Sequence, residues 1–61
     1  MKVIDLSGPG GNAFALLGLA KKLAKELDMN SDLVIKDMTS GDYEHLKTVF
    51  EGYFGDYVEL R

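Results

Sequence analysis

The chain contains no cysteine and no tryptophan, and it has a single histidine, His45. Without cysteine it can form neither a disulfide nor a thiolate metal site, and one histidine excludes a multi-histidine zinc site. The acidic residues lack the spacing of an EF-hand loop. We therefore expect no structural metal and no cofactor.

The chain is also short. At 61 residues it is near the lower limit for one self-sufficient hydrophobic core, so we expect residues 1–61 to form a single small α/β domain. Disulfides and metals are excluded as sources of extra stability, which leaves homo-oligomerisation as the common remaining one.

Basic residues are fewer than acidic ones, seven against ten, which gives a net charge of −3. This balance argues against nucleic acid as a partner, because phosphate binding needs a clustered basic surface. Lys21, Lys22 and Lys25 form the one basic cluster, and their helical spacing is typical of a solvated face. A mildly acidic protein is suited to a basic surface on another protein.

Long apolar runs are missing as well. No stretch approaches the roughly 20 apolar residues of a membrane-spanning helix, and the N-terminus lacks the pattern of a signal peptide. We expect a cytoplasmic protein with no membrane partner.

Both ends of the chain alternate between apolar and polar residues, which predicts two short strands, Lys2–Leu6 and Tyr57–Leu60. In the first strand, Ile4 and Leu6 share one face, and Val3 and Asp5 share the other. In the second strand, Val58 and Leu60 are expected to face inward, and Tyr57 and Glu59 outward.

Between the strands, apolar residues recur at helical spacing in three segments. The predicted helices are Ala13–Leu27, a shorter one that Asn30 or Ser31 caps and that runs to about Thr39, and Tyr43–Phe54. Asn12 and Asp42 are good N-caps for the first and third helices, and Gly41 suits a left-handed position after the second.

These elements predict an α+β fold of order β-α-α-α-β, with the terminal strands paired antiparallel in a small sheet on the helices. A sheet of two strands is marginal and leaves its edges open, so we expect a second copy of the chain to complete it. The strands can pair within one chain or across the dimer.

The first predicted helix begins with eight residues, 13–20, that have no polar side chain. With Leu16 at the centre of the buried face, about 100° per residue places Phe14 and Gly18 near the opposite side. Either Phe14 folds back under the preceding turn and Gly18 permits close packing within the fold, or both residues, with Leu17, face a subunit or target. We favour the interface.

Tyr43 and Tyr57 differ from the other aromatic residues because carboxylates flank both in the sequence. A tyrosine in such a setting suits the rim of a protein interface, since its ring supplies area while its hydroxyl stays hydrated. We expect both residues to contribute to binding.

Residues 7–12 form a glycine-rich turn between the first strand and the first helix. Gly8, Gly10 and Ala13 match G-x-G-x-x-A, but the chain has no room for a second half of a dinucleotide fold and lacks a Walker lysine. We favour a structural turn. The alternative, a site that sequesters a nucleotide or phosphate, would use the backbone of Gly8, Gly10, Gly11 and Asn12.

Catalytic residues are not evident. His45 lies at a charged helix start, and Ser7 has no nearby base in the sequence, so a catalytic triad would need His45 to fold over the turn. We predict no enzyme activity.

Several segments together resemble a group of very short proteins encoded by bacteriophages and prophages. They are Ile4–Leu6, Gly8–Phe14, Gly41–Glu44 and Phe54–Val58. The resemblance spans nearly the whole chain and carries over no catalytic residue. Several phage proteins of this size inhibit bacterial anti-phage defence, and the resemblance makes an inhibitor of the anti-Hachiman type one candidate for this chain.

The sequence therefore favours a non-enzymatic, homodimeric, phage-type accessory protein that binds a host protein in the host cytoplasm. A structural role in phage growth is a further possibility that the residues do not separate from this one.

Overall fold

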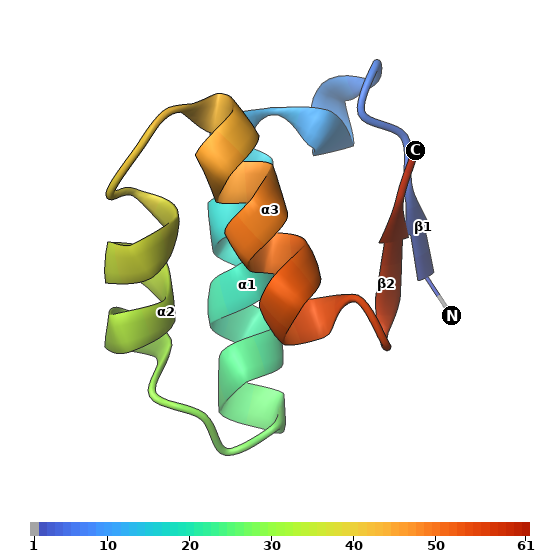
Figure 1. The fold of residues 1–61 in the computed structure, drawn as a ribbon. Helices are drawn as coiled ribbons and strands as arrows, with labels where there is room; N and C mark the ends of the chain where they lie inside the picture. Colours follow the sequence, from blue (N-terminus) through green and yellow to red (C-terminus); the bar gives the residue numbers. More distant parts are fainter. Residues whose placement is uncertain (1) are drawn as a thin grey trace.

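The computed structural model describes residues 2–61, and Figure 1 shows their arrangement. The elements, in order, are β1 (Lys2–Ile4), η1 (Pro9–Gly11), α1 (Ala13–Glu26), α2 (Ser31–Met38), α3 (Tyr43–Phe54) and β2 (Val58–Leu60). In Figure 1, α3 lies in front of α1, α2 lies to the left of both, and the two strands lie beside α3 on the side away from α2. The three helices and the mixed α/β composition agree with the prediction.

The two strands are parallel, so the predicted antiparallel pairing is wrong. Lys2 lies opposite Val58 and Ile4 lies opposite Leu60. The direction follows from the number of helices between the strands. Each helix reverses the course of the chain, and Figure 1 shows that α1 and α3 run against β1 while α2 runs with it. The chain reverses direction on entering α1, α2, α3 and β2. After these four reversals β2 runs in the same direction as β1.

The first strand is shorter than predicted, because Asp5 and Leu6 already belong to a turn. Pairing nevertheless continues past the end of β1. The Arg61 N–H donates to the Ile4 carbonyl at 2.9 Å, and the Leu6 N–H donates to the Arg61 carbonyl at 2.7 Å. The last residues of the chain therefore fix the path by which the turn leaves the sheet.

The core lies between the three helices and the inner face of the sheet. Its buried side chains are Leu16, Ala20, Ala24, Val34, Met38, Leu46, Phe50, Phe54 and Val58. Of the two residues predicted to face inward in the second strand, Val58 is buried and Leu60 packs against the core at partial burial, as do Ile4 and Leu6, which share one face of the first strand. The outer face of the sheet is open, with Val3 and Tyr57 each 49% exposed.

Each helix starts at a side-chain cap. The side-chain oxygen of Asn12 accepts from the Ala15 N–H at 2.8 Å, and that of Asp42 accepts from the His45 N–H at 2.9 Å. These two caps confirm the prediction. For α2, Asn30 is the cap.

The left-handed residue expected at a helix end is in a different place. Asp28, after α1, has φ 58°, and no described glycine has positive φ, so the prediction for Gly41 is wrong. The N–H groups of Asp28 and Met29 donate to the carbonyls of Lys25 and Ala24, which is a Schellman motif. Glycine suits position 41 for a different reason. A Cβ there would lie within 3.0 Å of the His45 side chain.

Candidate protein-binding surface

Phe14 lies in the first turn of α1 with 86% of its surface exposed. The ring therefore does not fold back under the glycine-rich turn, which was one of the two alternatives considered. A phenylalanine in this position leaves a large apolar side chain in water, and such side chains contribute strongly when an interface covers them.

Gly18 lies one turn further along the same face of α1. A Cβ at this position would meet no atom within 4 Å, so no contact inside the chain requires glycine here. Glycine inside a helix nevertheless costs about 0.5–1 kcal/mol relative to alanine. The exposed backbone beside Phe14 is thus unexplained by packing within the fold.

The exposed residues Phe14, Gly18, Lys21 and Lys25 follow one another along α1 at intervals of three or four residues, and we call them the α1 outer stripe. Leu17, predicted to join the interface, is half-buried and packs against the core. It borders the stripe without belonging to it.

Tyr43 is part of the fold rather than a free rim residue. Its hydroxyl donates to the Gly11 carbonyl. The Lys47 ammonium lies 5.1 Å from the centre of its ring and pairs with Glu44 at 2.9 Å, and the hydrogen bond to Glu44 raises the pKa of Lys47. The Tyr43 side chain is thereby held on both its ring and its hydroxyl, and it connects α3 to the turn before α1.

Tyr57 lies at the end of the sheet opposite to the glycine-rich turn. Its carbonyl accepts from the Lys2 N–H at the start of β1, whereas the glycine-rich turn follows the end of β1. The five residues predicted for an interface therefore do not form one continuous patch.

The glycine-rich turn satisfies several of its own N–H groups. The Gly8 N–H donates to the Asp5 carbonyl and the Gly11 N–H donates to the Gly8 carbonyl, both at 3.1 Å. The Asn12 side chain donates to the Pro9 carbonyl at 3.0 Å and also caps α1. These bonds compete with any anion for the same donors.

Gly11 also shows why glycine is needed in this turn. The residue is buried, and a Cβ there would lie closer than 3.0 Å to Leu6 Cα. The turn thus packs directly on the backbone that leaves β1, which supports the structural interpretation of its glycines.

Asp5 and Ser7 close the start of the turn. The Ser7 hydroxyl donates to the Asp5 carboxylate at 2.7 Å, and the Ser7 N–H donates to the same oxygen at 2.9 Å. Both hydrogen bonds lower the pKa of Asp5, and the bond from the Ser7 hydroxyl has the larger effect. Because its hydroxyl is directed to Asp5, Ser7 belongs to a different hydrogen-bonded group from His45.

His45 contacts the end of α2. Its Nε2 lies 3.0 Å from the Asp37 carbonyl and 2.9 Å from the Ser40 hydroxyl, which itself donates to that carbonyl at 2.7 Å. In the tautomer that carries the proton on Nε2, the imidazole donates to the Asp37 carbonyl and caps the end of α2.

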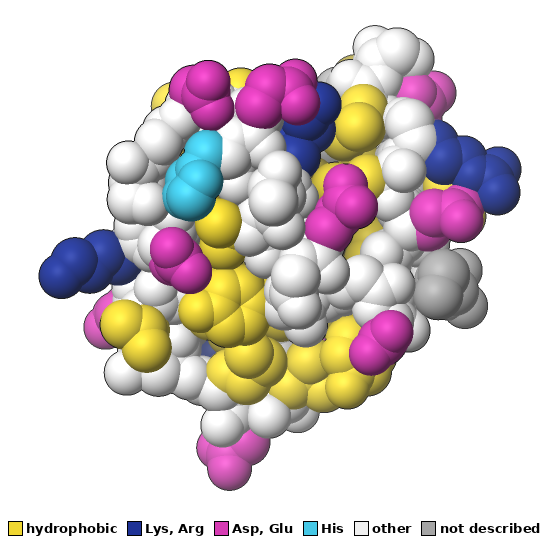
Figure 2. All heavy atoms as spheres, in the orientation of Figure 1, with side chains coloured by type: hydrophobic (Ala, Val, Ile, Leu, Met, Phe, Trp, Pro, Cys, Tyr) yellow, Lys and Arg dark blue, Asp and Glu magenta, His cyan; other side chains and the backbone are white. Residues whose placement is uncertain are grey.

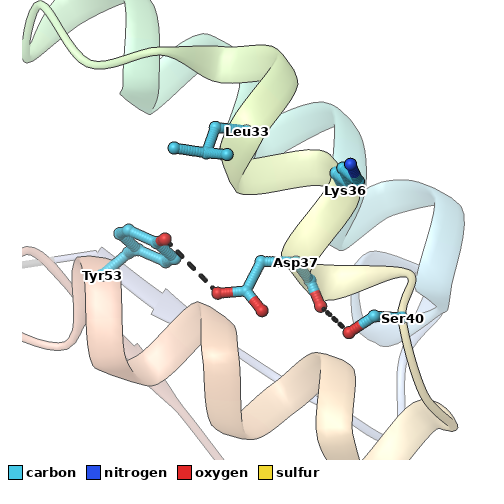
Figure 3. A pocket seen from close by; sticks show the side chains of 5 residues that line it. All are labelled: Leu33, Lys36, Asp37, Ser40 and Tyr53. Atoms are coloured by element: carbon cyan, nitrogen blue, oxygen red, sulfur yellow. Dashed lines mark hydrogen bonds between the residues drawn. The ribbon is translucent and has the colours of Figure 1, made fainter.

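A groove between α2 and α3 was missed by the sequence analysis. Figure 3 shows the residues along one part of it, which are Leu33, Lys36, Asp37, Ser40 and Tyr53. The adjoining part is lined by Asp37, Val49, Gly52 and Tyr53. The spacing of Leu33, Val49 and Tyr53 on their helices was visible in the sequence, but only the packing of α2 on α3 brings them together.

Comparison with protein-family models, with curated proteins and with solved structures gives no match to this chain. Within residues 2–61, no group of three or more His, Asp or Glu side chains is arranged to hold a metal ion. None of the described helices is both long enough and apolar enough to cross a membrane.

Proposed function

We propose that this protein acts without catalysis by binding another protein through the α1 outer stripe, with Phe14 as the anchoring side chain. The observation that carries the proposal is the 86% exposure of Phe14. An aromatic ring so exposed gains free energy when a partner covers it, and aromatic residues are enriched at the centres of interfaces.

Gly18 supports the same proposal. Apart from its chain neighbours and the α1 backbone, no atom of residues 2–61 would lie within 4 Å of a Cβ here, so the bare backbone lets a partner approach α1 closely beside the Phe14 ring. Lys21 and Lys25 continue the stripe with positive charge, which favours a partner with carboxylates next to an apolar pocket.

The resemblance to small phage proteins supports a host protein as the partner, and a component of an anti-phage defence system in the host cytoplasm is the candidate we propose. The small size of the chain and the open edges of its two-stranded sheet support a homodimer as the form that binds. Sedimentation velocity at micromolar concentration tests the dimer, and a monomer there would remove that part of the proposal.

The binding surface is tested by Phe14→Ala, with Val3→Ala as the matched control on the exposed face of the sheet. Both variants should keep the wild-type circular dichroism spectrum, because both side chains are exposed. For a host protein captured from infected cells, Phe14→Ala should weaken the affinity about 30-fold, the effect of losing an interface anchor worth about 2 kcal/mol. Val3→Ala should change it little, and equal affinities for the two variants would refute the assignment.

A further inference from the structure

The groove between α2 and α3 has an apolar lining that is open to solvent. Leu33 is 59% exposed on one wall, while Val49 and Tyr53 are half-buried on the other. Its two parts have volumes of about 280 and 360 Å³ and share Asp37 and Tyr53, so they form one continuous depression. In Figure 3 the Leu33 and Tyr53 side chains lie on facing walls.

Gly52 gives the groove a bare backbone surface. It lies inside α3, where a Cβ would meet no atom within 4 Å, so the packing of the fold does not require glycine here. The missing side chain leaves space into which an apolar side chain of a partner fits.

The segment that supplies both walls of this groove is mainly acidic, although Lys36 lies beside Asp37 in the lining. From Asp28 to Glu59 the sequence contains eight acidic and two basic residues, whereas residues 2–27 contain two acidic and four basic ones. Figure 2 shows Asp and Glu side chains around the hydrophobic surface on this face of the molecule. A cationic partner is therefore favoured here by the sign of the field.

Asp37 is the carboxylate in the wall of the groove, and it is exposed. Among residues 2–61, its carboxylate receives one side-chain hydrogen bond, a long one of 3.4 Å from the Tyr53 hydroxyl. Most of its capacity to accept hydrogen bonds remains, and a lysine or arginine of a partner is the donor that suits it best.

We propose that this groove binds a basic amphipathic helix of another protein, with a large apolar side chain over Gly52 and a flanking lysine or arginine on Asp37. The α2–α3 groove supplies an apolar surface for the helix and an acidic rim for its charges, which is the pattern of helix-in-groove recognition.

A second copy of the chain fits the groove less well. Its basic element, the α1 outer stripe, is exposed on the side of α1 away from the core, whereas α2 and α3, which form the groove, pack on the buried side of α1. Placing the stripe of one copy in the groove of the next would be a head-to-tail contact, which extends into open chains rather than closing a dimer. A small molecule is also disfavoured, because the groove is open to solvent along its length and would leave much of a small ligand uncovered.

The test uses the full chain labelled with ¹⁵N and two synthetic helical peptides of about 18 residues, long enough to be helical. One combines leucine with lysine, and the other has glutamate in place of every lysine. The lysine peptide should bind saturably and shift the amide signals of Leu33, Asp37, Val49, Gly52 and Tyr53. The glutamate peptide should leave these signals unchanged.

Gly52→Gln and Gly18→Gln form a matched pair of variants. Both place the same polar side chain into open space, so both should fold, which circular dichroism and thermal melting verify. Gly52→Gln should weaken binding of the lysine peptide about tenfold, and Asp37→Asn should weaken it by about threefold or more, whereas Gly18→Gln should have no effect.

Four results would overturn the proposal. They are shifts that map to α1, equal binding of the two peptides, unchanged affinity of Gly52→Gln, and groove signals that move with protein concentration alone, which would make a second copy the occupant. Because Phe14 lies outside the groove, the outcome is independent of the test of the α1 outer stripe.

Discussion

The Tyr43 hydroxyl donates a hydrogen bond to the backbone carbonyl of Gly11, which joins residues 32 positions apart in the sequence. The bond ties the first turn of α3 to the turn that leads into α1. The path from β1 into α1, and with it the position of Phe14, thus depends on a tertiary contact.

Tyr43→Phe removes this hydrogen bond while keeping the ring that Lys47 covers. We expect the free energy of unfolding to fall by about 1 kcal/mol, the usual net value of one such bond. Urea denaturation measures the change. Tyr57→Phe is the control, because within residues 2–61 the Tyr57 hydroxyl has no hydrogen-bond partner, and its variant should match the wild type.

Gly11→Ala and Gly10→Ala separate the two glycines at the centre of the turn. A Cβ at Gly11 would clash with the Leu6 backbone, whereas a Cβ at Gly10 would lie 4.0 Å from Ile4 Cγ2, an ordinary contact. We expect Gly11→Ala to lower the free energy of unfolding by about 1–3 kcal/mol and Gly10→Ala to change it by less than about 0.5 kcal/mol. Equal thermal midpoints for the two variants would contradict the packing of Gly11 on Leu6.

Asp28→Gly should stabilise the protein. Asp28 has φ 58°, a conformation that glycine adopts without the steric cost of a Cβ. We expect the free energy of unfolding to rise by about 0.5–1 kcal/mol, measured by chemical denaturation. Asp32→Gly, in the first turn of α2, is the control variant and should lower the free energy of unfolding. If Asp28→Gly destabilised the protein instead, the Asp28 carboxylate would contribute more to stability than the backbone conformation costs.

Asp5 and Ser7 give a pH dependence with a defined sign. The Ser7 hydroxyl and N–H lower the pKa of Asp5 below its ordinary 3.8. A carboxyl with a lowered pKa in the folded state stabilises the protein above its unfolded pKa, and this contribution disappears as the pH falls through the folded pKa. Carbon-detected NMR titration of Ser7→Ala should show the Asp5 pKa moving upward, although the N–H still lowers it. An unchanged pKa would mean that the hydroxyl does not bond Asp5 in solution.

The elements were predictable where one local signal sufficed. The helix Tyr43–Phe54 was predicted with its bounds as observed, because Asp42 caps it and its apolar residues recur every three or four positions. The end of α1 was located within one residue, but its left-handed residue, Asp28, was not recognised, since glycine is the usual signal for that conformation.

The candidate surfaces were predictable only in part. The position of Phe14 opposite Leu16 follows from helical periodicity, and the structure agrees with it. Tyr43 is flanked in the sequence by acidic residues, as a residue at the rim of an interface would be. Its hydroxyl nevertheless donates to the carbonyl of Gly11, a partner too distant in sequence to be inferred. The α2–α3 groove and the role of His45 as a cap for α2 were missed for the same reason.

The sequence by itself determined the three helices and their caps at Asn12 and Asp42. These follow from interactions among residues a few positions apart. Only the tertiary structure decided that the strands are parallel and that Gly52 lies open in an acidic groove. Both depend on how the three helices pack against one another, which is set by contacts between residues far apart in the chain.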